Sequence, residues 1–109
     1  MIYQTKISNQ AKSDLQDIYE YIAFTLLSPE NAKTQLKRLE KGTLSLDHLP
    51  KRFKLYQDVL WHDQELRVMP VDNFLVFYIS YNQKQFIKIL RIMYNGSDIS
   101  KELHNSKLD

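Results

Sequence analysis

The segment FLVFYISY, residues 74–81, is apolar or aromatic at every position except Ser80. Alternate residues of a strand face opposite sides of a sheet, so a strand of this composition has to be covered on both sides. The short polar segments VDN (71–73) and NQKQ (82–85) flank it and are expected to be turns, since Asp and Asn tolerate turn backbone conformations. The sequence therefore predicts a central strand with cover on both of its faces.

Three further segments are expected to complete the sheet. ELRVMPV (65–71) reads as a short strand before the first turn, and FIKILRIMY (86–94) reads as a longer one after the second turn. Together with residues 74–81 they should form an antiparallel meander. IYQTKIS (2–8) alternates weakly between apolar and polar residues and is expected to join an edge of the sheet.

Two helices are predicted between the first strand and the meander. Ser8 or Asn9 can cap the first helix, whose apolar stripe continues to about Leu27. Ser28 and Pro29 suit the N-cap and the first position of the second helix, which should run to about Leu49. The stripes that support these helices are Ala11, Leu15, Ile18 and Ile22, and Ala32, Leu36, Leu39, Thr43 and Leu46.

Helices joined this tightly form an antiparallel hairpin that has to bury its apolar stripe. Residues 51–63 are irregular and are expected to form a loop, and SDISKEL (97–103) is expected to add a capped helical turn. The predicted fold is α+β, with the order β-α-α-β-β-β and the helical hairpin packed on a small, mainly antiparallel sheet. Residues 1–109 are expected to form a single domain, because no linker or repeat interrupts them.

Composition excludes several classes of chemistry. The chain has no cysteine, which excludes disulfides and thiolate catalysis, and its three histidines lie far apart in sequence. We therefore expect neither a metal nor a cofactor. The longest apolar stretches are too short to cross a bilayer, and the first ten residues lack the apolar region of a signal peptide. A cytoplasmic protein without membrane contact is the expectation.

The net charge of +2 is too small to imply nucleic-acid binding, but the basic residues are unevenly distributed. Several lie at helical spacing on the second predicted helix, and others follow in the loop. They form either a solvated helix face or a docking surface for ribosomal RNA, for DNA or for an acidic partner segment. These residues are Lys33, Lys37, Arg38 and Lys41 on the helix, and Lys51, Arg52 and Lys54 in the loop.

Five motifs occur in an order that resembles the RelE/ParE superfamily of toxins from bacterial type II toxin–antitoxin systems. They are AKSDL (11–15), SPENA (28–32), LDHLP (46–50), RVMPVDNFLVFY (67–78) and ILRIMYNGSD (89–98). The resemblance implies a growth-inhibiting toxin of the plasmid stabilisation type, neutralised by a cognate antitoxin in a hetero-oligomer. The antitoxin would be a small, often acidic protein encoded beside this gene. We expect it to lay an extended or helical segment along the sheet edge and the helical hairpin.

The superfamily contains two activities. RelE-like members cleave mRNA in the ribosome, and ParE-like members poison DNA gyrase. In RelE-type enzymes the second and third strands carry basic residues, and the hairpin alignment places these at Leu66, Val68 and Leu75 of this chain. The resemblance therefore implies a ParE-like toxin that acts on gyrase. The alternatives are a ribosome-dependent mRNA endoribonuclease, and a non-toxic relative that acts only as a binding protein.

A nuclease would need cations for the phosphorane charge and groups for proton transfer. Arg67, Arg91, Tyr94 and His62 are the candidates. Arg67 either contacts a phosphate or partner, or serves the fold by pairing with Glu65 or packing its stem over the sheet. An unperturbed histidine titrates near neutral pH, so His62 is either a base or a surface histidine.

Arg91 and Tyr94 share the last predicted strand. Arg91 is expected on one face with Ile87, Ile89 and Met93, as a buried ion pair, a phosphate ligand or an antitoxin contact. Tyr94 is either a general acid or a packing aromatic. Residues three apart face opposite sides of a regular strand, so the two share a cleft only if the strand bulges or ends between them.

Overall fold

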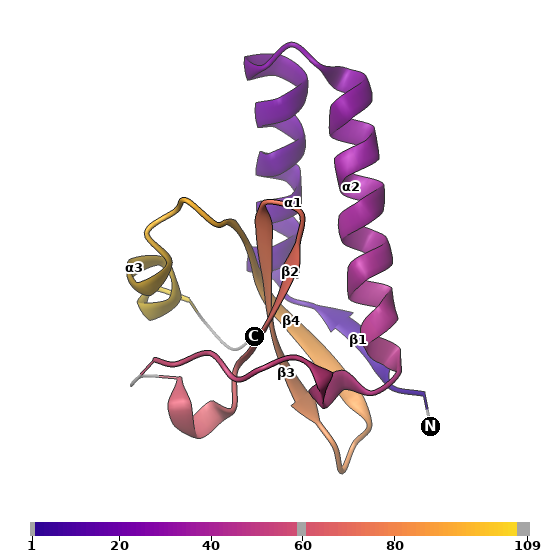
Figure 1. The fold of residues 1–109 in the computed structure, drawn as a ribbon, viewed down its shortest axis with the longest axis vertical. Coiled ribbons are helices and arrows are strands. Elements are labelled where there is room, and N and C mark those ends of the chain that lie inside the picture. The colour runs from indigo at the N-terminus through magenta and orange to yellow at the C-terminus, as the bar shows by residue number, and fades with distance from the viewer. Residues whose placement is uncertain (1, 59–60, 107–109) are drawn as a thin grey trace.

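The structure is a computed structural model that describes residues 2–58 and 61–106, leaving the side chain of His62 outside the description. One four-stranded sheet has the order β1-β4-β3-β2 (Figure 1). Its strands are β1 (Gln4–Ile7), β2 (Arg67–Val71), β3 (Phe74–Tyr81) and β4 (Phe86–Tyr94). β1 runs parallel to β4, while β4, β3 and β2 form the expected antiparallel meander. The α+β class, the edge position of the first strand and the central position of residues 74–81 are confirmed.

The helices are α1 (Asn9–Glu20), α2 (Pro29–Leu44) and the short α3 (Ile99–His104). Figure 1 shows α1 and α2 as an antiparallel pair that covers one side of the sheet and extends beyond it, with α3 on the other side. Short 3-10 turns, η2 (Ser45–Asp47), η3 (Pro50–Arg52) and η4 (His62–Gln64), interrupt the connection between α2 and β2. None of the helices in the described part of the chain has the length and apolarity of a membrane span.

Both long helices end earlier than the apolar stripes predict. After Glu20 the backbone continues as a π-helical turn, η1 (Tyr21–Thr25), in which the Leu26 N–H donates to the Tyr21 carbonyl. α2 ends at Leu44 rather than near Leu49, because the chain tightens into the 3-10 turn η2. Periodicity cannot separate these geometries, because each irregular piece is only about one turn long and one turn is too short to define a period.

Ser8 joins the start of α1 to the sheet. Its buried hydroxyl accepts a hydrogen bond from the Ala11 N–H at 3.0 Å, which confirms the predicted N-cap, and donates to the Leu90 carbonyl at 2.7 Å. Asp98 caps α3 in the same way, accepting from the Lys101 N–H at 3.3 Å. The N-cap hydroxyl of Ser8 therefore also fixes the position of α1 on β4.

Two apolar clusters lie on the two faces of the sheet. The first lies under the α1–α2 hairpin, and the second lies under α3 and the connection between α2 and β2. Alternate residues of β3 belong to different clusters, with Val76 and Tyr78 in the first and Phe77 and Ile79 in the second. This arrangement explains why FLVFYISY has no polar face.

A β-bulge in β4 changes which residues share a face. Phe77 pairs with Arg91 and Tyr78 pairs with Ile89, so Leu90 is the extra residue. Ile89 belongs to the first cluster, whereas Leu90 belongs to the second and Arg91 lies opposite Phe77 on that second face. The prediction that Arg91 shares a face with Ile87 and Ile89 is therefore wrong, because it assumed a regular strand.

The connection between α2 and β2 is irregular but firmly attached to the sheet. The Tyr56 N–H donates to the Leu66 carbonyl at 2.7 Å, and the Val68 N–H donates to the Lys54 carbonyl at 3.2 Å. Further along, the Trp61 indole N–H donates to the Leu103 carbonyl of α3 at 3.0 Å. These hydrogen bonds fix the connection and α3 over the second cluster.

Candidate functional site

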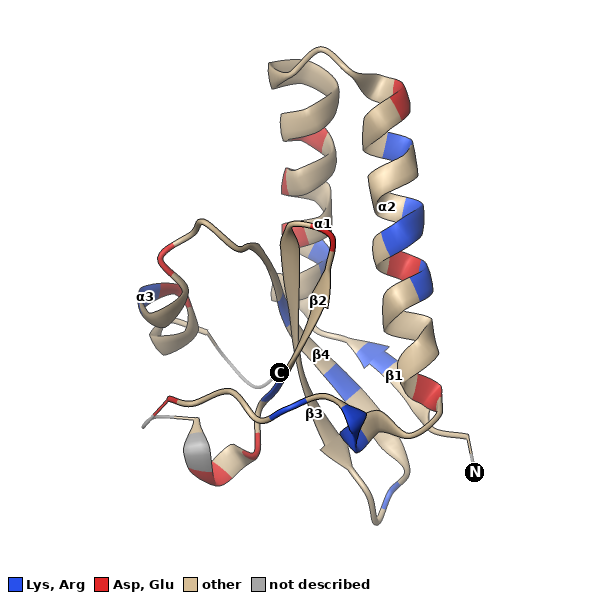
Figure 2. Cartoon of the chain, viewed as in Figure 1, with Lys and Arg blue, Asp and Glu red and all other residues tan. Residues whose placement is uncertain are grey.

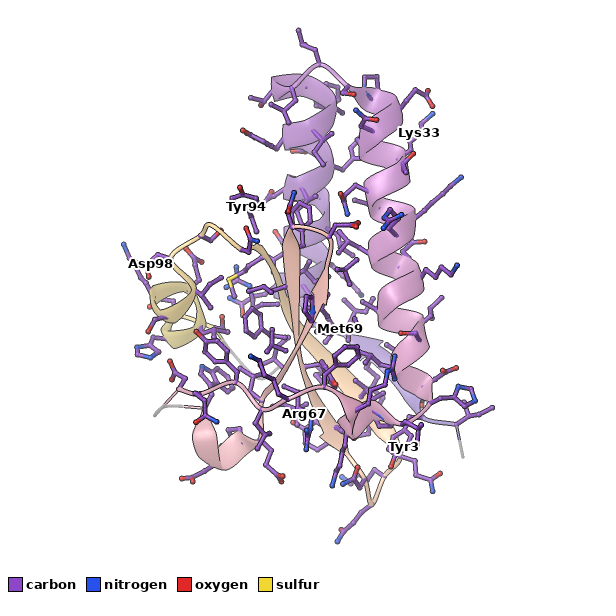
Figure 3. All side chains as sticks on the ribbon, viewed as in Figure 1. Tyr3, Lys33, Arg67, Met69, Tyr94 and Asp98 are labelled. Carbon is purple, nitrogen blue, oxygen red and sulfur yellow. The ribbon has the colours of Figure 1, made fainter. Side chains whose placement is uncertain are left out.

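A groove of about 990 Å³ lies between the helical hairpin and the end of the sheet where β3 begins and β4 ends. Its walls are largely apolar, and Tyr21, Leu26 and Tyr94 are each more than half exposed. Figure 3 shows Tyr94 at this end of the sheet, near α1. A groove of this volume with an exposed apolar lining is typical of a binding site. The apolar lining consists of Ile18, Tyr21, Ile22, Leu26, Phe74, Ile92, Met93 and Tyr94.

Arg38 and Asp72 form an ion pair on one wall of the groove. The Arg38 guanidinium, on α2, contacts both Asp72 carboxylate oxygens at 2.7 Å, and the Gln35 amide donates to Asp72 at 3.0 Å. These hydrogen bonds from Arg38 and Gln35 hold the pKa of Asp72 below its usual value, and the bond to Asp72 raises the pKa of Arg38. The pair connects α2 to the turn between β2 and β3.

Arg91 is the centre of a second, more buried network. Its guanidinium contacts both Asp14 oxygens at 2.8 and 3.0 Å, and both side chains are 12% exposed. It also donates to the Ser106 hydroxyl at 2.9 Å and lies 3.5 Å from the Glu102 carboxylate. The hydrogen bond to Asp14 raises the pKa of Arg91. This geometry is that of a buried ion pair that ties α1, β4 and α3 together, while a catalytic or antitoxin-binding role for Arg91 stays a prediction.

Arg67 holds the connection between α2 and β2 against the sheet through hydrogen bonds. It donates to the carbonyls of Phe53 at 2.7 Å and Lys51 at 3.3 Å, and no ion pair joins it to Glu65 in the described part of the chain. Its register partner Tyr78 donates to the Pro50 carbonyl at 2.6 Å. Burial raises the pKa of Tyr78 to about 12, although Arg67 and Arg52 oppose the shift.

Arg67, Arg91 and Tyr94 are not gathered in one cleft. In the strand register Arg67 lies opposite Tyr78, which belongs to the first cluster. Arg91 lies opposite Phe77, which belongs to the second cluster on the other face of the sheet. Arg91 and Tyr94 both line the groove, which extends around the end of the sheet, and Arg67 is not part of its lining. Tyr94 is 53% exposed and meets Phe74 edge-on at 6.1 Å. The side chain of His62 lies outside the described residues, so its predicted role stays open.

The predicted basic surface divides into two groups. Arg38 is engaged with Asp72, and Arg52 donates to the carbonyls of His48 at 2.6 Å and Ser45 at 3.2 Å. The other members are exposed lysines, and the described residues give them no ion pair. Figure 2 shows basic residues in a row along α2 and a second group near η3. The lysines available for binding are Lys33, Lys37, Lys41, Lys51 and Lys54.

Leu66, Val68 and Leu75, the positions at which the resemblance led us to expect basic residues in an mRNA-cleaving toxin, lie in or against the second apolar cluster. Leu66 is 1% exposed, Val68 is 7% exposed, and Leu75 packs against the same cluster. Trp61 and Leu103 are buried in this cluster with them. The space around these three positions is therefore filled by apolar packing.

Sequence reasoning missed the polar rim of the groove. Asp14 and Asp17 lie beside the apolar stripe of α1, and the helical spacing of Asp14, Asp17 and Tyr21 marks one edge of that helix. This spacing was visible in the sequence, whereas the approach of Glu102 from α3 was not. Within the described ranges, no three potential ligand side chains lie close enough together to hold a metal ion.

The sequence matches a family model described as the ParE toxin of the type II toxin–antitoxin system parDE, over residues 5–99. None of the curated proteins matches it significantly. The fold is similar to a chain of the chromosomal ParDE system from P. aeruginosa, with a TM-score of 0.70, 19% identity, and coverage of 85% of this chain and 96% of that one.

Two further structures share the fold. The toxin–antitoxin complex RelBE2 from Mycobacterium tuberculosis gives a TM-score of 0.65 at 15% identity, covering 89% of this chain and 95% of the other. A mutant of the E. coli toxin RelE in the free state gives 0.62 at 10% identity, with coverage of 94% and 93%. At these identities the similarity concerns the fold alone.

Proposed function

The chain belongs to the ParE toxin family of type II toxin–antitoxin systems. From this membership we propose that the protein inhibits growth by acting on DNA gyrase. We also propose that a cognate antitoxin neutralises it. The proposal places its action in the bacterial cytoplasm, where gyrase and the chromosome are found.

The observation that carries the choice of gyrase over mRNA is the second apolar cluster. Cleavage of RNA needs cations near the scissile phosphate and groups that move protons. Leu66, Val68 and Leu75, which the resemblance aligns with basic residues of RelE-type enzymes, are packed with Trp61 and Leu103. A phosphate at these three positions would meet buried hydrocarbon instead of charge, and Arg91, a cation on the same face, is already paired with Asp14. The arrangement supports a toxin that works by binding its target.

The groove supports the antitoxin part of the proposal. Two of the similar structures are described as toxin–antitoxin systems or complexes. The groove offers an apolar surface along the helical hairpin, which suits a helical or extended segment of a partner protein. We place the antitoxin segment there.

The exposed lysines support contact with a nucleic-acid-bearing target. Lys33, Lys37 and Lys41 follow one another at four-residue intervals, about 6 Å apart along α2. Because they have no partner in the described part of the chain, they are available to phosphates of DNA held by gyrase. A toxin that reaches gyrase on its DNA would use this surface.

The test is induction of the gene in cells without the antitoxin, followed by parallel assays. We expect growth arrest, gyrase-dependent DNA cleavage complexes and an SOS response, together with intact mRNA. A Lys33→Gln, Lys37→Gln, Lys41→Gln variant should be less toxic than a variant that loses three lysines elsewhere, at Lys12, Lys84 and Lys101. Growth arrest with normal supercoiling and intact DNA would contradict the proposed target.

The second candidate is a ribosome-dependent endoribonuclease, favoured by the presence of Arg91 and Tyr94 in the lining of one groove. It predicts new codon-positioned 5′ ends by primer extension after induction. A triple variant, Arg67→Ala, Arg91→Ala, Tyr94→Phe, should then be harmless. Because the first two changes remove structural contacts, Tyr94→Phe alone is the cleaner variant. Harmless overexpression of the wild type would instead indicate a non-toxic binding protein.

A further inference from the structure

The groove is acidic, although the chain as a whole carries a net charge of +2. Among the described residues, four carboxylates line it, from Asp14, Asp17, Asp72 and Glu102, against the two guanidiniums of Arg38 and Arg91. Asp72 and Asp14 each bind one guanidinium through both oxygens. Asp17 has no ion pair to another described residue, and Glu102 has only the 3.5 Å contact to Arg91. These two carboxylates therefore give the groove its excess negative charge.

The excess charge lies at one end of the groove. Asp17 follows Asp14 by one turn of α1, and Asp14 and Glu102 both contact Arg91. The other end, toward the tip of the hairpin, is formed by Tyr21 and Leu26, which are each 56% exposed. The groove thus changes from acidic near α3 to apolar near the hairpin tip.

We propose that the antitoxin segment that fills this groove is apolar where it meets Tyr21 and Leu26 and carries a Lys or Arg that pairs with Asp17 and Glu102. This inference rests on the proposed function and specifies its partner. An occupant without a cation would desolvate the Asp17 carboxylate uncompensated and leave Glu102 with only its 3.5 Å contact to Arg91, and an acidic occupant would add repulsion. The lysines of the basic surface contribute nothing to this choice, because none of them lines the groove.

The experiment measures binding of the purified toxin to the protein encoded by the neighbouring reading frame, by calorimetry at two salt concentrations. The variant Asp17→Asn, Glu102→Gln removes the two carboxylates that give the groove its excess negative charge. The variant Glu30→Gln, Glu40→Gln makes the same change of charge on exposed positions of α2 outside the groove. Thermal unfolding of each variant establishes that it is folded.

We expect the Kd of the groove variant to rise about 3- to 30-fold, as for the loss of two partly exposed ion pairs, and its dependence on salt to weaken. The control variant should bind within about twofold of the wild type. Exchange of the antitoxin cation for Glu should be rescued in part by Asp17→Lys. If the groove variant binds as the control does, the inference is overturned.

A separate variant keeps this result distinct from failure of the proposed function. Tyr21→Ser, Leu26→Ser weakens the apolar wall and leaves the carboxylates in place. If it weakens binding while the carboxylate variant does not, the antitoxin occupies the groove without the basic anchor, and only the inference fails. If the wild type does not bind the neighbouring protein at all, the antitoxin part of the proposed function fails with it.

Discussion

Substitution of Asp14 by Ala is expected to be among the most destabilising single changes outside the apolar clusters. The change removes both carboxylate oxygens that hold Arg91 and also the acceptor of the Ile92 N–H at 2.9 Å. Removing one member of a buried ion pair leaves an uncompensated charge and costs about 3–5 kcal/mol. Arg91 keeps its contacts with Ser106 and Glu102, so the lower end of this range applies. We expect a loss of about 3 kcal/mol, a large fraction of the 5–15 kcal/mol typical of a domain.

The assay is urea unfolding followed by the fluorescence of Trp61, the single tryptophan, which is buried in the second cluster. The midpoint should fall with little change in slope, and the melting temperature should fall by about 12 °C. Asp14→Ala combined with Arg91→Met should be more stable than Asp14→Ala alone, because the double variant has no orphaned cation.

Arg38→Gln is the matched control. The Arg38–Asp72 pair has the same two-oxygen geometry at 2.7 Å, but the Arg38 side chain is 61% exposed. Its removal should lower the melting temperature far less, because water replaces the lost contacts. A loss below about 1 kcal/mol for Asp14→Ala would refute the argument that burial, rather than contact geometry, sets the strength of these pairs.

Three other predictions concern stability. Ser8→Ala should cost about 2–3 kcal/mol in urea unfolding, because it removes an N-cap and leaves the Leu90 carbonyl without its hydroxyl donor; a loss under 0.5 kcal/mol would contradict this. Gly42→Ala should lower the melting temperature and cost about 1 kcal/mol, despite the better helix propensity of Ala. The new Cβ would lie 2.9 Å from Val71 Cγ2, which is too close. A higher melting temperature would show that the helix can shift to make room. Between pH 10 and 12 the wild type should lose roughly 2 kcal/mol more stability than Tyr78→Phe. The reason is that Tyr78, with its pKa raised to about 12, keeps its proton in the folded state and loses it on unfolding. Parallel plots of unfolding free energy against pH for the two proteins would disprove this assignment.

The strands and helices were predictable from the sequence because local periodicity encodes them. Residues 74–81 and 86–94 form β3 and β4 with the expected bounds, and Pro29 begins α2 as expected. The bulge at Leu90 was not predictable, since the sequence around it alternates no differently from a regular strand. The Leu90 carbonyl at the bulge accepts a hydrogen bond from the hydroxyl of Ser8, which lies far away in the chain.

The candidate site was less predictable than the fold. The sequence cannot distinguish Arg38 and Arg52, which are engaged with Asp72 and with backbone carbonyls, from the lysines that stay exposed. Arg91 was recognised as unusual because an arginine in an apolar strand needs a partner, but its partner Asp14 is 77 residues away. The groove itself depends on three elements meeting at one end of the sheet, which no local pattern records.

The pairing of β1 with β4 also has a consequence for synthesis of the protein. β1 and the Ser8 cap are fixed by contacts with β4, whose residues are synthesised 82 positions later in the chain. At about 5–20 residues per second, a ribosome needs roughly 4–16 s to make that stretch. A nascent or truncated chain that stops before residue 86 lacks β4, which is the strand that pairs with β1 and one of the two that pair with β3. Folding of the sheet, and any activity that depends on it, can therefore be completed only after residues 86–94 have been synthesised.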